Sequence, residues 1–163
     1  MIVFYIAFAF RVFSPTISSL KCAIVVLVCL FHDVILPLGL SSLFKIPISI
    51  PVVIALLTIV GYSINNTVVV YDRLREIFQK FPQKPFYQMI DEAISQTLSR
   101  QINTSLTTLF PLFSILLFLG KDLKDFSLIL ILGIVFGLYS SIFLSLTLLG
   151  SWQKRLTKSK KFD

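Results

Sequence analysis

The sequence predicts an all-α fold, a polytopic membrane helix bundle of about five transmembrane helices, of which the first is partial. Hydrophobic residues make up 56% of the 163 residues and charged residues only 14%, whereas soluble domains contain nearer a quarter charged residues. The mean hydropathy is +0.89, and long apolar runs recur along the chain. These observations indicate one integral membrane domain over residues 1–163.

The expected spans follow the apolar runs in order. The first run, residues 1–13, is too short for a full crossing, because Arg11 follows only ten apolar residues and a helical span needs about 20. We therefore expect a partial first span there. The later runs are long enough to cross, and they predict spans at residues 23–44, 47–71, 102–119 and 126–152.

The basic residues are distributed unevenly between these spans. Most Lys and Arg residues fall in residues 72–100 and in the tail 153–163, whereas the opposite side receives Lys45, Lys121 and Lys124. The positive-inside rule then places the long loop and the tail in the cytoplasm or its organellar equivalent. The same rule accounts for the net charge of +7, so we expect a lipid bilayer and no nucleic acid as the partner of the basic residues.

The long loop, residues 72–100, contains a helical pattern of its own. After Pro82 and Pro85, apolar residues recur at helical spacing from Phe86 to Leu98, with polar residues on the opposite face. This pattern predicts an amphipathic helix that lies along the membrane surface before the chain enters the next span at Arg100.

Small residues recur every four positions in the last span. Gly133, Gly137, Ser141 and Ser145 would share one helix face, where small side chains let another helix approach closely. We expect this face to form a tight helix contact, either within the chain or with a partner subunit.

The segment "VGYSINNTVVVYDRLRE" places a group of polar residues inside a hydrophobic span: Tyr62, Ser63, Asn65, Asn66 and Thr67. A second polar stripe is expected in the next long span, formed by Arg100, Asn103, Thr104, Thr107, Pro111 and Ser114. Two such stripes could face each other and enclose water, or could join helices by hydrogen bonds. Ionisable residues at membrane depth, here His32, Asp33 and Arg100, usually mark ion or proton pathways. Both interpretations stay open from the residues alone.

The residues do not predict an enzyme. A single His argues against a multi-histidine zinc site, and no Gly-rich phosphate-binding loop is present. Cys22 and Cys29 would lie two turns apart on one helix, too far for a disulfide. We expect no catalytic residues, no metal and no cofactor.

Four motifs together resemble a known family: "LFHDVILPLGL", "GYSINNTVVVYDRLRE", "TLSRQINTSLTTL" and "GIVFGLYSSIF". They resemble the C-terminal membrane half of SecF subunits of the Sec protein translocase, in order over residues 11–149. The resemblance implies half of a permease core of the resistance-nodulation-division type. It also implies a SecD-like partner, a nearby SecY channel, a preprotein in transit and use of the proton gradient, in a bacterial plasma membrane or a plastid or thylakoid membrane.

The resemblance also assigns site residues, with one departure. The family's motif has Asp, the presumed proton carrier, where this chain has Asn66, and an amide cannot bind and release a proton near neutral pH. Arg100 matches the family's functional arginine. We therefore expect Asn66→Asp to raise proton-gradient-dependent export, and Asp33→Asn to change export less than Arg100→Ala does.

Three alternatives remain for the function. The chain is a SecF-like export subunit, a scaffold or degenerate remnant without proton coupling, or a small-molecule permease of the same fold. The family's full subunit has a first membrane helix and a globular domain before the matched region, so we expect residues 1–13 to be part of the family's second helix. Drug-exporting relatives need large extramembrane domains to capture substrates, which favours the first two alternatives.

Overall fold

The structure is a computed structural model that describes the backbone of residues 19–159 and the side chains of residues 22–152. The expected partial span at residues 1–13 and the end of the basic tail, residues 160–163, lie outside these ranges. The described chain is helical throughout, without a strand, and four of its helical segments are long and apolar enough to cross a membrane. The elements are α2 (Ser19–Leu43), α3 (Ile50–Lys80), α4 (Phe86–Phe118), α5 (Lys121–Tyr139), the π-helix η1 (Ser140–Leu144) and α6 (Ser145–Ser159).

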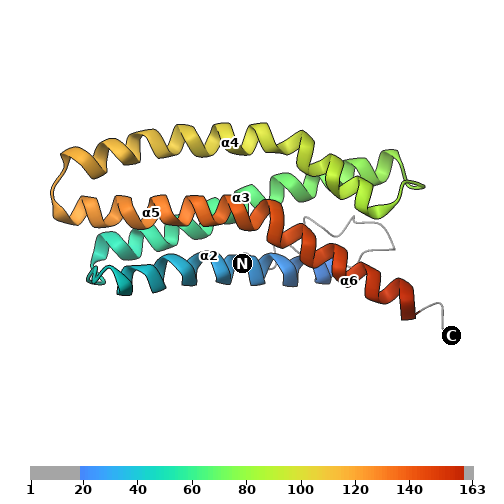
Figure 1. Cartoon of the computed structure of the whole chain (residues 1–163), viewed down its shortest axis with the longest axis horizontal. Coiled ribbons are helices and arrows are strands. Elements are labelled where there is room, and N and C mark those ends of the chain that lie inside the picture. The colour runs from blue at the N-terminus through green and yellow to red at the C-terminus, as the bar shows by residue number, and fades with distance from the viewer. Residues whose placement is uncertain (1–18, 160–163) are drawn as a thin grey trace.

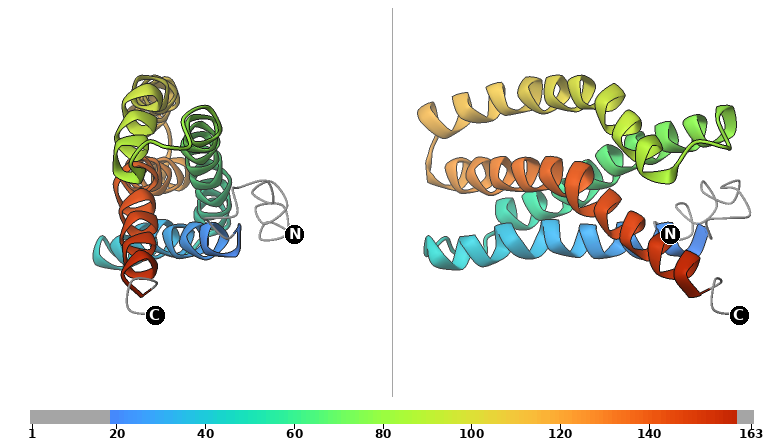
Figure 2. Two further views of the ribbon diagram at one scale, coloured as in Figure 1. Left: turned by 90° about the vertical axis from the view of Figure 1, so that its right-hand side faces the viewer. Right: turned by 45° about the vertical axis from the view of Figure 1, so that its right-hand side comes forward.

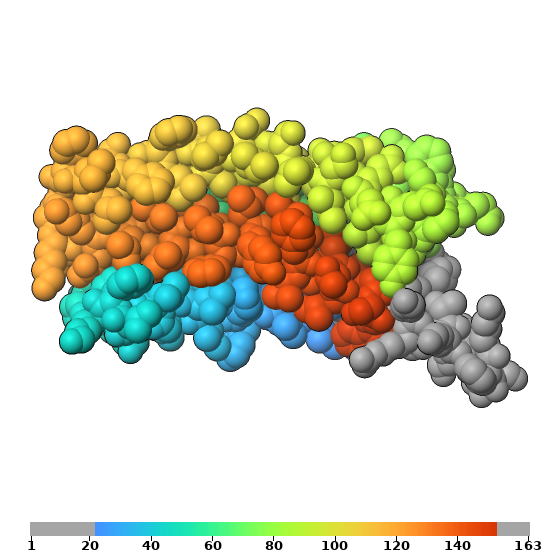
Figure 3. Space-filling view, viewed as in Figure 1, coloured from blue at the N-terminus to red at the C-terminus, as the bar shows by residue number. Residues whose placement is uncertain are grey.

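The helices form an elongated bundle with α5 at its centre (Figure 1). α5 contacts α2, α3 and α4, and it fills the space between α4 and α2 on the face shown in Figure 3. α3 crosses behind these helices, and η1 and α6 continue α5 towards the C-terminal end (Figure 2). The residues of α5 and η1 therefore meet side chains from all the other long helices.

Turn-forming residues set the ends of the helices. Lys45 adopts a positive φ of 55° in the turn after α2, and Ser49 caps α3 in an extended conformation with Pro51 in the first turn, where the ring is tolerated. α4 begins directly after Pro85. Gly120 is the extended residue before α5, so the connection between α4 and α5 is short and the two helices are antiparallel.

The helices differ from the expected spans in the region of residues 72–100. We expected a separate amphipathic helix on the membrane surface, whereas α3 continues to Lys80 and α4 runs without a break from Phe86 through Arg100 to Phe118. The apolar face of the expected surface helix packs instead on the extension of α3, where Met89, Ile90 and Ala93 join the same apolar cluster as residues of α3. This packing buries the apolar face within the protein, so that no bilayer surface is needed to cover it.

Polar contacts hold the same hairpin on its outer side. Arg73 donates a hydrogen bond to Gln96 at 2.5 Å and also pairs with Glu76. Lys84 lies 2.6 Å from the carboxylate of Glu92. The Arg73–Gln96 bond joins α3 to α4, the Lys84–Glu92 pair joins the turn to α4, and the Arg73–Glu76 pair lies within α3.

The last expected span, residues 126–152, is also longer and less regular than the sequence indicates. It runs from α5 through η1 to α6, and the π-helix interrupts the α-helical hydrogen bonding at Ser140–Leu144. π-helical turns are rare and are found frequently at functional sites.

The core consists of two apolar clusters with a buried polar layer between them. One cluster lies near the α3–α4 hairpin and contains Cys22, Ala23, Val26, Val70, Tyr71, Leu74, Ile77, Met89, Ile90, Ala93, Leu146 and Leu149. The other lies near the α4–α5 connection and contains Val52, Ala55, Ile59, Leu112, Ile129, Leu130 and Ile134. The polar layer consists of Asp33, Ser63, Asn66, Thr67, Gln101, Ser105, Ser140, Ser141 and Ser145, all buried.

Candidate functional site

The polar layer is assembled from helical positions three or four residues apart. Ser63, Asn66 and Thr67 face inward from α3, and Gln101 and Ser105 face inward from α4. Residues at i, i+3 and i+4 share one face of a helix, so each helix presents its polar residues as a compact group. Ser140, Ser141 and Ser145 complete the layer from η1 and the beginning of α6.

Asp33 of α2 occupies one half of this layer. Its side chain is completely buried, at 0% exposure. The Oδ2 atom accepts hydrogen bonds from the Ser63 hydroxyl at 2.5 Å and from the Ser140 hydroxyl at 2.6 Å. Because Ser63 belongs to α3 and Ser140 to η1, a single carboxylate oxygen joins three helices.

The other carboxylate oxygen of Asp33 faces a histidine. Nδ1 of His32 lies 3.0 Å from Oδ1 of Asp33, and the His32 side chain is 31% exposed. His32 lines an open pocket of about 380 Å³, together with Leu36, Val135, Phe136 and Tyr139. His32 therefore lies between the buried carboxylate and the outer surface of the bundle.

Asn66 of α3 occupies the other half of the layer, and its environment is different. Its side chain is 2% exposed, and its Nδ2 donor has no hydrogen-bond partner among the residues that the structure describes. The neighbouring amide, Gln101 of α4, donates to the backbone carbonyl of Asn66 at 3.3 Å and accepts from the Ser141 hydroxyl at 3.0 Å. Gln101 thus links α3, α4 and η1, while the amide of Asn66 adds no hydrogen bond of its own.

Three further hydroxyl groups of α3 make hydrogen bonds at the edges of the polar layer. Tyr62 donates to the Ser105 hydroxyl at 2.9 Å, which joins α3 to α4. Thr67 donates to the backbone carbonyl of Ser63 at 2.9 Å within α3. The Tyr71 hydroxyl donates to the Ser145 carbonyl at 3.3 Å. These contacts leave the layer mostly satisfied, with the Asn66 donor as its exception.

The small-residue face of the last span lies against other helices of the same chain. A Cβ atom at Gly133 would collide with the Ile59 side chain, so α5 and α3 touch closely there. A Cβ at Gly137 would lie 3.7 Å from Oδ2 of Asp33 and 3.8 Å from Cβ of Ser63. These are ordinary van der Waals distances, so the close approach of α5 to α3 requires a glycine at 133 and not at 137.

The second expected polar stripe does not face the first one. Arg100, Asn103, Thr104, Thr107, Pro111 and Ser114 are not buried and lie on the outer side of α4. Asn65 of α3 is also exposed, unlike its neighbours Ser63 and Asn66. The structure does not bring Arg100 to Asn66, because the residue that points inward at this level of α4 is Gln101.

Gln101, Ser105 and Ser140 are not among the site residues that the sequence predicted. Gln101 and Ser105 are four residues apart and continue the inward face of Met89, Ala93 and Thr97, so the apolar periodicity of residues 86–98 could have placed them. Ser140 lies seven residues after Gly133 and three after Gly137, so the small-residue face of the last span could have placed it; the π-helix changes the register only after this residue.

Comparisons with known proteins agree with this architecture. The family described as protein export membrane protein SecD/SecF, C-terminal, matches residues 1–155. SecF of Synechocystis is 42% identical over 140 residues, covering 83% of this chain and 44% of that protein. SecDF of Thermus thermophilus is 41% identical over 155 residues, covering 95% of this chain and 20% of that protein.

Solved structures of SecDF share the fold. The crystal structure of SecDF in its super-membrane-facing form superposes with a TM-score of 0.88 and 38% identity, over 98% of this chain and 21% of that one. A second SecDF structure, from Thermus, gives a TM-score of 0.84 and 39% identity, over 93% of this chain and 20% of that one. The chain spans less than half the length of the curated SecF relatives it matches. From the family match, the shared fold and these identities, the chain belongs to the SecD/SecF family of protein export membrane proteins, and it corresponds to the C-terminal membrane region of SecF.

Proposed function

We propose that this chain acts as the membrane half of a SecF-type subunit, which pairs with a SecD-like subunit and assists the movement of preproteins through a SecY channel. The relatives it resembles are protein translocase subunits. In the Thermus relative the two names are joined in one protein, SecDF, which supports a SecD-like partner for a chain that matches the SecF part. The residues of the pathway would be those of the polar layer, with Tyr62 and the exposed Asn65 and Arg100 at its edge.

The observation that carries the proposal is the exposed polar stripe on α4. Arg100 and Asn103 lie on the outer side of a helix that is apolar enough to cross a membrane, and within the described residues neither side chain makes a hydrogen bond to another helix. Arg100 lies directly before the expected span 102–119, and a charged side chain that enters the bilayer is costly in lipid and normally faces protein or a water-filled cavity. A partner subunit covering α4 and the adjacent Asn65 would supply that environment.

The hydroxyls of the same stripe are satisfied within their own helix. Thr104 and Thr107 donate to the carbonyls four residues earlier, those of Arg100 and Asn103, each at 3.0 Å. The groups that need an outside partner are therefore the guanidinium of Arg100 and the amide of Asn103. These are the groups with which a second subunit would make its polar contacts.

The proposed membrane is a bacterial plasma membrane or a plastid or thylakoid membrane of bacterial descent. The α3–α4 hairpin would face the cytoplasm or stroma, because residues 72–100 and the tail carry most of the basic residues. In this orientation the extension of α3 and the beginning of α4 would project from the membrane on that side.

A second candidate is a scaffold subunit without proton coupling of its own. It is favoured by Asn66, which replaces the carboxylate of the family motif with an amide that does not titrate. In this case SecD would carry the proton step, and the chain would only hold SecD in place.

Reconstituted export tests the proposal. Membrane vesicles would contain the chain, an N-terminal SecF segment, a SecD-like subunit and the SecY channel, and preprotein uptake would be measured with and without an uncoupler. We expect Arg100→Ala to lower the uncoupler-sensitive part of export by about tenfold or more, as for loss of about 1.4 kcal/mol of coupling. Lys80→Ala, which removes an exposed cation at the end of α3, is the matched control and should leave export unchanged.

The partner contact is measured separately by photo-cross-linking. A photoreactive side chain at Asn103 should capture the SecD-like subunit, whereas the same group at Phe31, on the exposed apolar side of α2, should not. Export that is insensitive to the uncoupler in the native chain, with cross-linking intact, would favour the scaffold. The proposal would be contradicted if Asn103 captured no SecD-like subunit and if export were the same with and without the chain.

A further inference from the structure

We propose that the groove between α2 and α5 is a docking surface for a transmembrane helix of the SecY channel, and that this helix carries a hydroxyl or amide side chain near its middle. This rests on the proposed function, in which SecY is the second membrane partner. It assigns that partner a surface on this chain, separate from the surface that would meet the SecD-like subunit.

The groove combines an apolar pocket with an aromatic surface. The pocket measures about 380 Å³ and is lined by His32, Leu36, Val135, Phe136 and Tyr139. Beside it the rings of Tyr139 and Phe143 stack, with their centroids 5.6 Å apart and an angle of 28° between their planes. Both side chains are more than half exposed, at 55% and 57%. Exposed aromatic side chains next to a hollow are typical anchors of protein interfaces.

Two polar groups of the groove lack partners within the described residues. The Tyr139 hydroxyl makes no hydrogen bond there, and the His32 ring makes a single polar contact, from Nδ1 to Asp33. When the proton of the neutral ring lies on Nδ1 and points to the carboxylate, Nε2 is left as an acceptor. The groove therefore offers one acceptor and one phenol group that can donate or accept.

Both groups lie at a depth where lipid cannot replace a missing partner. Tyr139 is the middle residue of the expected span 126–152, and His32 lies near the middle of the expected span 23–44. Tyr residues of membrane proteins gather at the two interfaces, and an intramembrane His normally faces protein or a water-filled cavity. Acyl chains could fill the pocket, but they would leave both groups unpaired. A helix that carries a polar side chain satisfies the pocket and the polar groups together.

The chemistry of the two groups selects the side chain of the partner. A donor is needed for Nε2 of His32, and the same side chain can also bond to the Tyr139 hydroxyl. Hydroxyl and amide side chains both donate and accept, whereas a carboxylate only accepts and a Lys or Arg only donates. A charged side chain would also be costly at this depth. The partner residue is therefore Ser, Thr, Asn or Gln.

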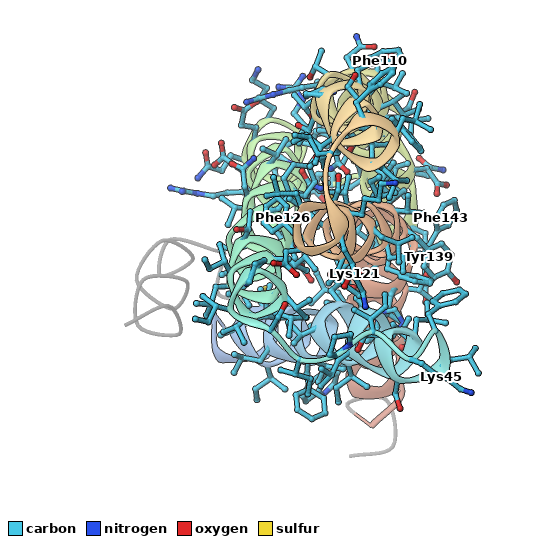
Figure 4. The ribbon with its side chains drawn as sticks, turned by 90° about the vertical axis from the view of Figure 1, so that its left-hand side faces the viewer. Lys45, Phe110, Lys121, Phe126, Tyr139 and Phe143 are labelled. Atoms are coloured by element: carbon cyan, nitrogen blue, oxygen red, sulfur yellow. The ribbon has the colours of Figure 1, made fainter. Side chains whose placement is uncertain are left out.

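The groove lies on a different side of the bundle from the surface proposed for the SecD-like subunit. That surface is formed by α4 and the adjacent Asn65 of α3. Figure 4 shows Tyr139 and Phe143 pointing away from α5 on the side opposite α3, while Phe110 points outward from α4. A SecD-like subunit on α4 and α3 leaves the groove open to a second membrane protein, which in the proposed function is SecY.

Photo-cross-linking tests the surface in vesicles that contain the chain, an N-terminal SecF segment, a SecD-like subunit and SecY. A photoreactive phenylalanine analogue at Phe143 should capture SecY. The same analogue at Phe110 should capture the SecD-like subunit, because Phe110 lies two turns after Asn103 on the same face of α4. Both positions carry exposed phenylalanines in the native chain, so the two probes are matched.

Two substitutions test the contact itself. Energy transfer between labelled chain and labelled SecY in vesicles, measured as added lipid dilutes them, reports their association. Tyr139→Phe keeps the ring and should weaken association about threefold, the average effect of one hydrogen bond between membrane helices. Val135→Trp fills the pocket from an exposed position and should weaken association about tenfold, as overpacking of a fitted contact does. Leu57→Trp, on an exposed position of α3, is the control and should leave it unchanged.

The outcomes separate this surface from the proposed function. Capture at Phe143 of lipid alone, of the N-terminal SecF segment or of the SecD-like subunit, without SecY, would overturn the docking surface, and so would unchanged association of Val135→Trp. Weaker association of Val135→Trp with no effect of Tyr139→Phe would overturn the polar contact. If the docking surface fails while Asn103 still captures the SecD-like subunit and Arg100→Ala still lowers export, the proposed function stands without it.

Discussion

Asp33 and Asn66 are both buried in the same polar layer, but their hydrogen bonding differs sharply. Asp33 receives hydroxyls from α3 and η1 and faces His32. Asn66 receives no partner for its Nδ2 donor. Both oxygens of the Asp33 carboxyl group thus have polar partners, whereas within the described residues the Asn66 Nδ2 atom has none.

This difference in hydrogen bonding shows that the surrounding helices direct their polar side chains towards Asp33 and not towards the Asn66 amide. In a membrane interior, polar groups must find their partners inside the protein, since lipid supplies none. Two other helices contribute to Asp33, through the Ser63 hydroxyl of α3 and the Ser140 hydroxyl of η1. Around Asn66, by contrast, Gln101 bonds to the backbone carbonyl and not to the side chain. The layer depends on Asp33 more than on Asn66.

The largest expected effect comes from removing the carboxylate. Asp33→Ala leaves the Ser63 and Ser140 hydroxyls without their shared acceptor, and each bond to a charged group contributes about 1.5–3 kcal/mol. We expect the free energy of unfolding to fall by about 3 kcal/mol, twice the lower value, measured by denaturant titration of the chain in mixed micelles.

A matched variant separates burial from charge. Asp91→Ala removes an exposed carboxylate from α4 and should change the unfolding free energy by less than about 0.5 kcal/mol. If Asp33→Ala and Asp91→Ala lower the unfolding free energy by the same amount, the hydrogen bonds of Asp33 do not hold the helices together. The contrast between Asp33 and Asn66 would then be wrong.

Much of the fold could be predicted from the sequence, because hydrophobicity alone identifies the spans. The four apolar runs all lie in helices long enough to cross a membrane, and the motifs identified the family. The separate surface helix was not found, because an apolar helical face has the same pattern whether it covers lipid or the extension of α3. Its amphipathic pattern carried no information about which of these lay beneath it.

The candidate site was predicted less completely, for a different physical reason. Ser63, Asn66, Thr67 and Asp33 do lie in one buried layer, as a polar group inside a span suggests. The stripe of Arg100 could have faced that of Asn66, but Arg100 is exposed, because the rotation of α4 is set by its apolar residues and a step of one residue turns a side chain by about 100°. Ser140 was overlooked although it shares a helix face with Gly133 and Gly137; the π-helix Ser140–Leu144 changes the register only for the residues that follow it.

A smaller loss of stability is expected when position 66 is given the same carboxylate side chain as position 33. Asn66→Asp introduces a carboxylate at a buried position where, within the described residues, the native side chain has an unpaired Nδ2 donor, so we expect a loss of about 1–3 kcal/mol, the cost of an unsatisfied buried group. The loss should be greater at alkaline than at acidic pH, because the neutral acid is easier to bury than the anion. Unfolding titrations at both pH values would measure it.

The same variant connects stability to export. The gain in gradient-dependent export that we expect from Asn66→Asp remains a prediction, and it requires the partner subunit to supply what this chain lacks around residue 66. Equal stability of Asn66→Asp at acidic and alkaline pH would show that the chain already supplies donors there, and would contradict the contrast with Asp33.

The smallest expected effect is that of Asn66→Leu, which removes the amide whose donor has no partner. Replacing an unsatisfied polar group by an apolar group of similar volume is often nearly neutral, so the unfolding free energy should change by less than about 1 kcal/mol. The Gln101 bond to the backbone carbonyl at position 66 does not involve the side chain and should persist. Asn65→Leu, one residue away on the exposed side of α3, is the control for the added hydrophobicity. If Asn66→Leu costs as much as Asp33→Ala while Asn65→Leu does not, the Asn66 amide has a partner in the assembled membrane, and both halves of the polar layer hold the bundle together.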